Sequence, residues 1–151
     1  MPPRRSAGIL LFRRTPQLQV LLGHMGGPFW ARKDDHAWSI PKGEHGEEED
    51  AETAARREFA EETGHPAPAG LIPLGVVRGS KVLTVWAAEG DLDADAVVSN
   101  TFELEWPPRS GRLQTFPELD RAAWLDLPTA RTKLVKGQLP FLDRLAELAG
   151  A

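Results

Sequence analysis

The stretch GEHGEEEDAETAARREFAEETG, residues 43–64, carries the strongest pattern in the chain. It predicts a helix between Asp50 and Gly64. Asp50 suits the N-cap, where a carboxylate accepts a hydrogen bond from a free backbone N–H. Ala54 and Ala55 are strong helix formers, and Gly64 suits the left-handed position that ends a helix. The side chains on the surface of this helix guide the interpretation of the rest of the chain.

At about 100° per residue, residues three or four apart form one stripe of the helix. The members of this stripe are Ala51, Ala54, Ala55, Glu58, Glu61 and Glu62. The three alanines are small, so this part of the helix can pack closely against a neighbouring element. The three glutamates continue the stripe beyond them. Like charges at this spacing repel by roughly 0.2–0.5 kcal/mol per pair in water, and more when water is excluded. A divalent cation such as Mg²⁺, Mn²⁺ or Ca²⁺ would remove that repulsion; the alternative is an ordinary solvated acidic face.

The spacing of fixed residues resembles the signature of the Nudix hydrolase family, G-x5-E-x7-R-E-U-x-E-E-x-G-U, in which U is a bulky apolar residue. Gly43 is followed after five residues by Glu49, and seven more residues lead to the run REFAEETG at 57–64. His65 occupies the last apolar position and is the one departure. The preceding residues 38–43, WSIPKG, are also similar to the family's common lead-in.

The resemblance implies an α+β fold, the Nudix α/β/α sandwich with a mixed central sheet, in which the signature loop and helix line the site. It implies water attack on a phosphoanhydride bond, with Mg²⁺ as cofactor and Mn²⁺ as an alternative. Glu58, Glu61 and Glu62 would be metal ligands. The carbonyl oxygen of Lys42 would be a further ligand. Glu58 is also a candidate general base.

Other signature residues would support this site. By the same resemblance, Arg57 would hold a carboxylate, either Glu58 or Glu49, through a bidentate pair rather than touch the substrate. Glu49, Gly43 and Gly64 would be structural. The Lys42 side chain could reach a phosphate as a point charge, or it could be a surface lysine.

Length and composition narrow the classes of protein. The chain has 151 residues, which suits a single domain over residues 1–151. A net charge of −4 argues against stable binding to nucleic acid, although it leaves nucleotide substrates open. There is no cysteine, so disulfides and thiol catalysis are excluded. The early apolar run at 7–12 is too short for a membrane span or an export signal, so we expect a cytoplasmic protein. The sequence does not indicate an oligomeric state.

The remaining pattern predicts strands before and after the acidic helix, and helices at the end. The expected strands are 6–13, 18–25, 38–41, 71–77, 81–87, 101–106 and 122–127. The expected later helices are 128–135 and 141–148, with a small helical turn around 93–97. The strands at 6–13 and 18–25 should form one hairpin, and those at 71–77 and 81–87 another. This order favours α+β over regular βαβ alternation.

Two loops offer candidate substrate-binding residues. In the loop at 26–37, Trp30, Arg32 and Lys33 could stack a base and meet a phosphate. The alternative is that the aromatic residues of this loop only anchor it to the core. In the turn-rich loop at 107–113, Arg109 could contact phosphate or simply be solvated.

An additional carboxylate is expected from outside the helix, because Nudix enzymes often add one as metal ligand or base. The segment TFELEW at 101–106 alternates, which places Glu103 and Glu105 on one face of a strand. They are the candidates, and the alternative is two solvent-facing glutamates.

The resemblance does not select the substrate. The first hypothesis is a pyrophosphohydrolase of nucleoside polyphosphates of the NTP type. The second is a dinucleoside-polyphosphate hydrolase of the Ap4A type, because Pro41-Lys42-Gly43 is similar to the lead-in of such enzymes. The third is a Nudix-fold binding module without catalysis. Such modules usually lose signature glutamates, and this chain keeps them.

Overall fold

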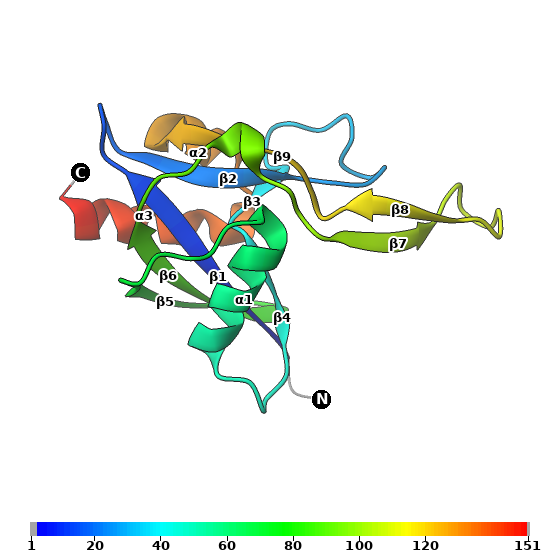
Figure 1. Cartoon of the computed structure of the whole chain (residues 1–151), viewed down its shortest axis with the longest axis horizontal. Helices are drawn as coiled ribbons and strands as arrows, with labels where there is room; N and C mark the ends of the chain where they lie inside the picture. The colour runs from blue at the N-terminus through cyan, green and yellow to red at the C-terminus, as the bar shows by residue number, and fades with distance from the viewer. Residues whose placement is uncertain (1–2, 151) are drawn as a thin grey trace.

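The computed structural model describes residues 3–150. Within them, one seven-stranded sheet and a separate two-stranded hairpin are combined with three α-helices (Figure 1). The large sheet contains β1 (Arg4–Arg13), β2 (Gln19–Met25), β3 (Trp38–Ser39), β4 (Lys42–His45), β5 (Ile72–Arg78), β6 (Lys81–Glu89) and β9 (Leu119–Asp126). The hairpin is β7 (Thr101–Glu105) with β8 (Leu113–Pro117). The helices are α1 (Ala51–Thr63), α2 (Leu127–Lys133) and α3 (Leu139–Ala149), with short 3-10 helices η1 (Ala94–Ala96) and η2 (Lys136–Gln138).

β1 is the central strand, and its pairing makes the sheet mixed. It runs parallel to β6, with Arg4 opposite Lys81 and Phe12 opposite Glu89. Along its other edge it pairs antiparallel with β4 at one end and with β2 at the other. β5 is antiparallel to β6, and β9 is antiparallel to β2. The α+β class with a mixed sheet is therefore confirmed.

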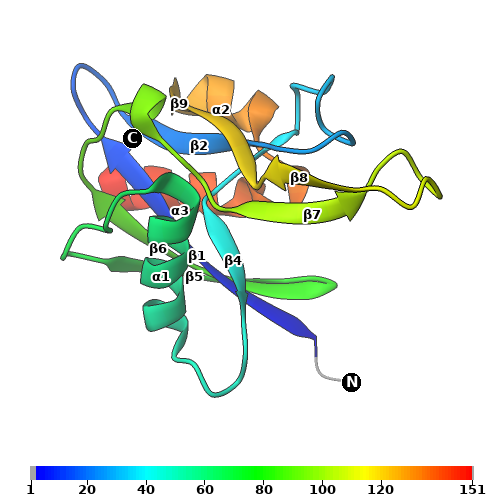
Figure 2. The ribbon, with the colours of Figure 1, turned by 45° about the vertical axis from the view of Figure 1, so that its right-hand side comes forward.

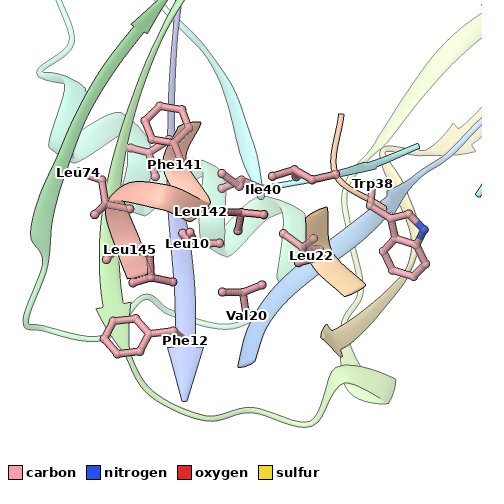
Figure 3. Packing of buried hydrophobic residues seen from close by; sticks show 14 of the residues in the cluster. Leu10, Phe12, Val20, Leu22, Trp38, Ile40, Leu74, Phe141, Leu142 and Leu145 are labelled. Atoms are coloured by element: carbon pink, nitrogen blue, oxygen red, sulfur yellow. The ribbon is translucent and has the colours of Figure 1, made fainter. Parts of the chain in front are cut away.

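The continuous apolar run of β1 is explained by helices on both faces of the sheet, because alternate residues of a strand face opposite sides. Ile9 and Leu11 are buried in the cluster that also contains Phe59 of α1. Leu10 and Phe12 are buried in the cluster on the other face. Figure 3 shows this second cluster, where the α3 side chains Phe141, Leu142 and Leu145 pack against the sheet.

Both predicted hairpins are present, and the predicted helices are present with slightly shifted ends. Two strands were not predicted. β4 begins at Lys42, where the sequence pattern predicts only a glycine turn, and β8 follows the loop at 107–112. Both strands are short and contain few bulky apolar residues, so their sequences carry only weak strand patterns.

The β7–β8 hairpin projects from the body of the molecule, away from α1 and the large sheet (Figures 1 and 2). Its loop holds Arg109, whose backbone φ is 62°. No helix within residues 3–150 has both the length and the apolar character needed to cross a membrane.

Candidate active site

Helix α1 begins and ends as its sequence predicts. The Asp50 side chain accepts a hydrogen bond from the backbone N–H of Thr53, which caps the N-terminus. Gly64 has φ 77°, and its N–H donates to the carbonyl of Ala60. These caps fix the helix register, so that Ala54 and Ala55 are buried against the sheet.

Glu58 lies against the backbone of Gly43 and is only 8% exposed. A Cβ atom added at Gly43 would lie 1.9 Å from Oε2 of Glu58, so only glycine leaves room for this carboxylate. Burial raises the pKa of Glu58, and the nearby charge of Glu61 raises it further, although Arg57 opposes this shift. The signature glycine thus positions a destabilised carboxylate.

Glu62 lies one helical turn further on and is 6% exposed. Its Oε1 accepts a hydrogen bond of 3.0 Å from the backbone N–H of Lys42. Burial raises the pKa of Glu62 to about 7, while the Lys42 hydrogen bond and charge act in the opposite direction. A carboxylate with this pKa is poised to lose its proton when a cation approaches.

Arg57 holds three carboxylates of the signature together. It donates a bidentate pair to Glu49, with both N–O distances at 2.9 Å. Its Nη1 also donates to Glu58 at 3.0 Å and to Glu61 at 3.3 Å. The hydrogen bonds from Arg57 lower the pKa of Glu49, and the same contact with Glu49 raises the pKa of Arg57. Arg57 therefore contacts both carboxylates that were considered as its partner.

Glu58 and Glu62 open into a polar hollow of about 300 Å³ beside α1. The hollow is lined by Lys42, Gly43, Glu44, Glu58, Glu62, Lys81, Asn100 and Glu118. Its lining is dominated by carboxylates, with lysines at Lys42 and Lys81. The carboxylates of this surface would repel an anionic ligand. Such a ligand fits only if positive charge lies between its acidic groups and the carboxylates of the protein.

A family model described as the NUDIX domain matches residues 2–145. The chain belongs to the Nudix family. A curated relative, an 8-oxo-(d)GTP phosphatase of Mycolicibacterium smegmatis, is 34% identical over 116 residues. That alignment covers 69% of this chain and 34% of the relative, so the chain spans about a third of that protein's length.

Solved Nudix structures share the fold. An Ap4A hydrolase of C. elegans, determined as a binary complex, superposes with a TM-score of 0.65 at 22% identity, covering 97% of this chain and 99% of that one. The NUDIX domain of Shewanella oneidensis NrtR, determined with ADP ribose, gives a TM-score of 0.67 at 20% identity, covering 99% of this chain and 90% of that one.

The Nudix family generally uses a divalent metal, and the oxygen donors around the hollow suit one. Glu58 and Glu62 are buried carboxylates with raised pKa values, which a cation would stabilise in the charged form. Among residues 3–150, no three acidic or histidine side chains are gathered closely enough to hold a metal ion together. The oxygen donors suit a divalent cation in their chemistry, but Glu61 is exposed and does not line the hollow, and the carboxylates that do line it are spread around it.

Two carboxylates from outside α1 line the hollow, Glu44 of β4 and Glu118, whereas Glu103 and Glu105 were the expected candidates. Glu103 and Glu105 lie on the exposed face of β7, and Glu105 accepts a hydrogen bond from the Gly111 N–H. Glu118 is placed by the return of the hairpin, because its N–H donates to the carbonyl of Asn100.

Asn100 in turn donates its backbone N–H to the carbonyl of Glu61, which ties this segment to the end of α1. Lys81 and Asn100 were also not identified from sequence. Lys81 begins β6, and it approaches the hollow because β6 pairs with β1 far along the chain. Nothing local in the sequence marks these residues, although Glu118 follows a strand-ending proline.

The predicted loop residues lie elsewhere. Trp30 packs against the apolar cluster on the α3 face, and Lys33 places its ammonium 5.3 Å from the Trp30 ring centre. Arg32 is exposed. Phe29 is 60% exposed and contacts Trp106 edge-on, with ring centres 5.3 Å apart. None of these residues lines the carboxylate hollow, and neither does Arg109.

Proposed function

We propose that this Nudix chain is a divalent-metal-dependent pyrophosphohydrolase that cleaves a phosphoanhydride bond of a nucleoside polyphosphate. The observation that carries the proposal is the hollow in which Glu58, Glu62 and Glu118 face the same space as Lys42 and Lys81. Buried acids alone would repel a phosphate, and lysines alone would not organise a metal. Together they match a metal–polyphosphate complex.

Each group has a role in this proposal. Glu58, Glu61 and Glu62 would hold Mg²⁺ or Mn²⁺, with the Lys42 carbonyl as a further ligand. The metal, when bound, neutralises phosphate charge and acidifies the attacking water.

The supporting residues act through charge and position. Glu118 supplies the additional carboxylate as a ligand or base, and Glu58 is the other candidate base. The ammonium groups of Lys42 and Lys81 would offset negative charge on the phosphates. Arg57 positions Glu58 and Glu61 without touching the substrate.

The choice of a nucleoside polyphosphate is supported by the name of the Mycolicibacterium relative, an 8-oxo-(d)GTP phosphatase. The second candidate is a dinucleoside polyphosphate of the Ap4A type. It is favoured by the Pro41-Lys42-Gly43 lead-in, whose lysine lines the hollow.

A substrate panel with Mg²⁺ tests the proposal. It should contain nucleoside triphosphates, their 8-oxo-purine forms, dinucleoside polyphosphates, ADP-ribose and nucleotide sugars, with products separated by chromatography. We expect selective turnover of triphosphates and no turnover in EDTA. Selective turnover of dinucleoside polyphosphates would favour the second candidate. Metal binding with no turnover of any compound would favour a binding module.

A further inference from the structure

The pairing of β9 with β2 contains a β-bulge two residues after Glu118, which lines the carboxylate hollow. The register shifts between His24 and Met25 of β2, and this leaves Asp120 as the extra residue of β9. A bulge bends its strand and redirects the side chains around it, and bulges are frequent next to active sites. This bulge therefore lies where it can set the direction of the Glu118 side chain.

The imidazole of His24 joins the bulge to the loop at 26–37. It is fully buried, and its Nδ1 lies 2.9 Å from Oδ1 of Asp120 while its Nε2 lies 2.6 Å from the carbonyl oxygen of Lys33. Each contact needs a proton, and Nε2 must donate because a carbonyl oxygen only accepts. The Trp38 ring packs edge-on against the imidazole, with ring centres 5.4 Å apart. His24 therefore holds Asp120 in one orientation.

Two glycines next to His24 make room for the chain on either side of Glu118. A Cβ atom added at Gly23 would lie 2.3 Å from Cδ1 of Leu119, and one added at Gly26 would lie 1.9 Å from the backbone oxygen of Pro117. The Gly26 N–H also donates a hydrogen bond of 3.0 Å to the carbonyl of Glu118. The four residues from Gly23 to Gly26 thus contact the chain before Glu118, at Glu118 and after it.

Glu118 needs such support because no helix or strand of its own holds it. It lies between β8 and β9, whereas Glu58 and Glu62 are fixed by α1. A metal ligand must be held within about 0.5 Å of its working position. Partners that orient a ligand typically change metal affinity by about 10- to 100-fold when they are removed.

We propose that His24 and Asp120 are positioning residues for Glu118. Their side-chain contact fixes the bulge, and the bulge directs the Glu118 carboxylate into the hollow. The inference rests on the proposed function, because that function assigns Glu118 a role as metal ligand or base. It adds two residues that act through Glu118, since neither of them lines the hollow.

The experiment measures the Mn²⁺ affinity of the metal-free protein by electron paramagnetic resonance, without nucleotide, so that hydrolysis is not involved. Asp120→Ala and His24→Phe remove the contact from its two sides. We expect each to weaken Mn²⁺ binding about tenfold, the lower end of the range for orienting partners, because they act through the backbone. Asp120→Asn keeps an oxygen acceptor for Nδ1 of His24 and should stay within about twofold of wild type. Wild-type affinity in Asp120→Ala would overturn the inference.

Asp126→Ala is the matched control at the other end of β9. The Asp126 carboxylate caps α2 by accepting a hydrogen bond of 2.8 Å from the Thr129 N–H. Its loss should lower the melting temperature and leave Mn²⁺ affinity unchanged. If Asp126→Ala weakens Mn²⁺ binding as much as Asp120→Ala does, the effect is a general loss of stability and the inference fails.

A double-mutant cycle with Glu118→Gln tests whether Asp120 acts through Glu118. Glu118→Gln alone should weaken Mn²⁺ binding about tenfold or more. Adding Asp120→Ala to Glu118→Gln should then cost no more than about a further twofold, because the group that it positions is already lost. Additive losses, or wild-type affinity in Glu118→Gln, would overturn the inference. The Asp120 side chain is 30% exposed, so the cycle needs no variant of the fully buried His24.

The two proposals fail in different ways. If the wild type hydrolyses a nucleotide but the losses in the cycle are additive, the positioning role is overturned and the proposed hydrolysis stands. If the cycle shows the expected coupling but the wild type hydrolyses no nucleotide, the proposed function is overturned and the positioning of Glu118 stands.

Discussion

The backbone N–H of Lys42 donates a hydrogen bond of 3.0 Å to Oε1 of Glu62. This bond joins β4, just before the signature glycine, to the last turn of α1. It also holds a buried carboxylate beside a lysine that lines the carboxylate hollow. The start of β4 and the last turn of α1 are thereby fixed relative to each other.

Glu62 should make the stability of the metal-free protein depend on pH. Burial raises its folded pKa from 4.5 to about 7, so the folded state binds more protons than the unfolded state between these values. The free energy of unfolding should therefore fall as pH rises from 5 to 8, by up to about 3 kcal/mol for this group. Chemical denaturation of wild type in EDTA measures this. Glu62→Gln should flatten the fall and Glu52→Gln, on the exposed side of α1, should not; an unchanged slope in Glu62→Gln would contradict the account.

Gly43→Ala should displace Glu58 rather than unfold the protein. The added Cβ would overlap the Glu58 carboxylate, which is the movable end of a side chain. Misplacing a reacting group by about 1 Å can cost about 100-fold in rate, so we expect a loss of that order in kcat with a small change in melting temperature. Gly46→Ala is the matched control, because its Cβ would overlap Glu48 in the same segment. Equal rates for the two variants would argue against this role of Gly43.

Arg57→Lys should keep a positive charge but lose the paired contact with Glu49. Glu58 and Glu61 would then lose a shared positioning partner. We expect kcat to fall about tenfold and the melting temperature to fall slightly, because the arginine is partly exposed and screened. Arg56→Lys is the control: Arg56 contacts the carbonyls of Pro68 and Ala69, away from the hollow. A loss of kcat in both variants would point to general damage to α1.

Glu118, rather than Glu103, should contribute to metal binding. Mg²⁺ at about 100 times its Kd should stabilise the folded wild type by about 2.7 kcal/mol, which is a rise of several degrees in melting temperature. Glu118→Gln should reduce this rise, and Glu103→Gln should leave it unchanged, because only Glu118 lines the hollow. Thermal unfolding with and without MgCl₂ measures both, and the reverse order of effects would restore the sequence-based candidate.

The sequence is sufficient to predict the part of the site that is local. Asp50, Gly64 and the spacing of the glutamates predict α1 and its register, because a helix is specified by residues three and four apart. The same spacing places Glu61 beside Glu58 and Glu62, and only the structure shows that Glu61 is exposed while the other two are buried. The alternating pattern at 101–106 predicts β7 but not its position. That strand belongs to a hairpin that projects from the body of the molecule (Figure 2), and its two glutamates do not line the carboxylate hollow.

The rest of the site depends on contacts between distant segments. Lys81 reaches it through the parallel pairing of β1 with β6, and Glu118 reaches it through the backbone bond to Asn100. Ser6 is an ordinary strand residue in sequence, and only the tertiary structure shows that its buried hydroxyl has no hydrogen-bond partner within residues 3–150. Such residues are identified by the tertiary structure, because no local pattern marks them.

The most direct test of the proposed hydrolysis measures Mg²⁺-dependent turnover by Glu58→Gln. The substrate is the nucleotide that the substrate panel selects, and Glu52→Gln is the control on the same helix. Glu58 is buried in the hollow, and Glu52 is exposed outside it. We expect Glu58→Gln to lower kcat by about 100-fold or more, and Glu52→Gln to stay within about twofold of wild type. Turnover by a folded Glu58→Gln variant at the wild-type rate would contradict this expectation.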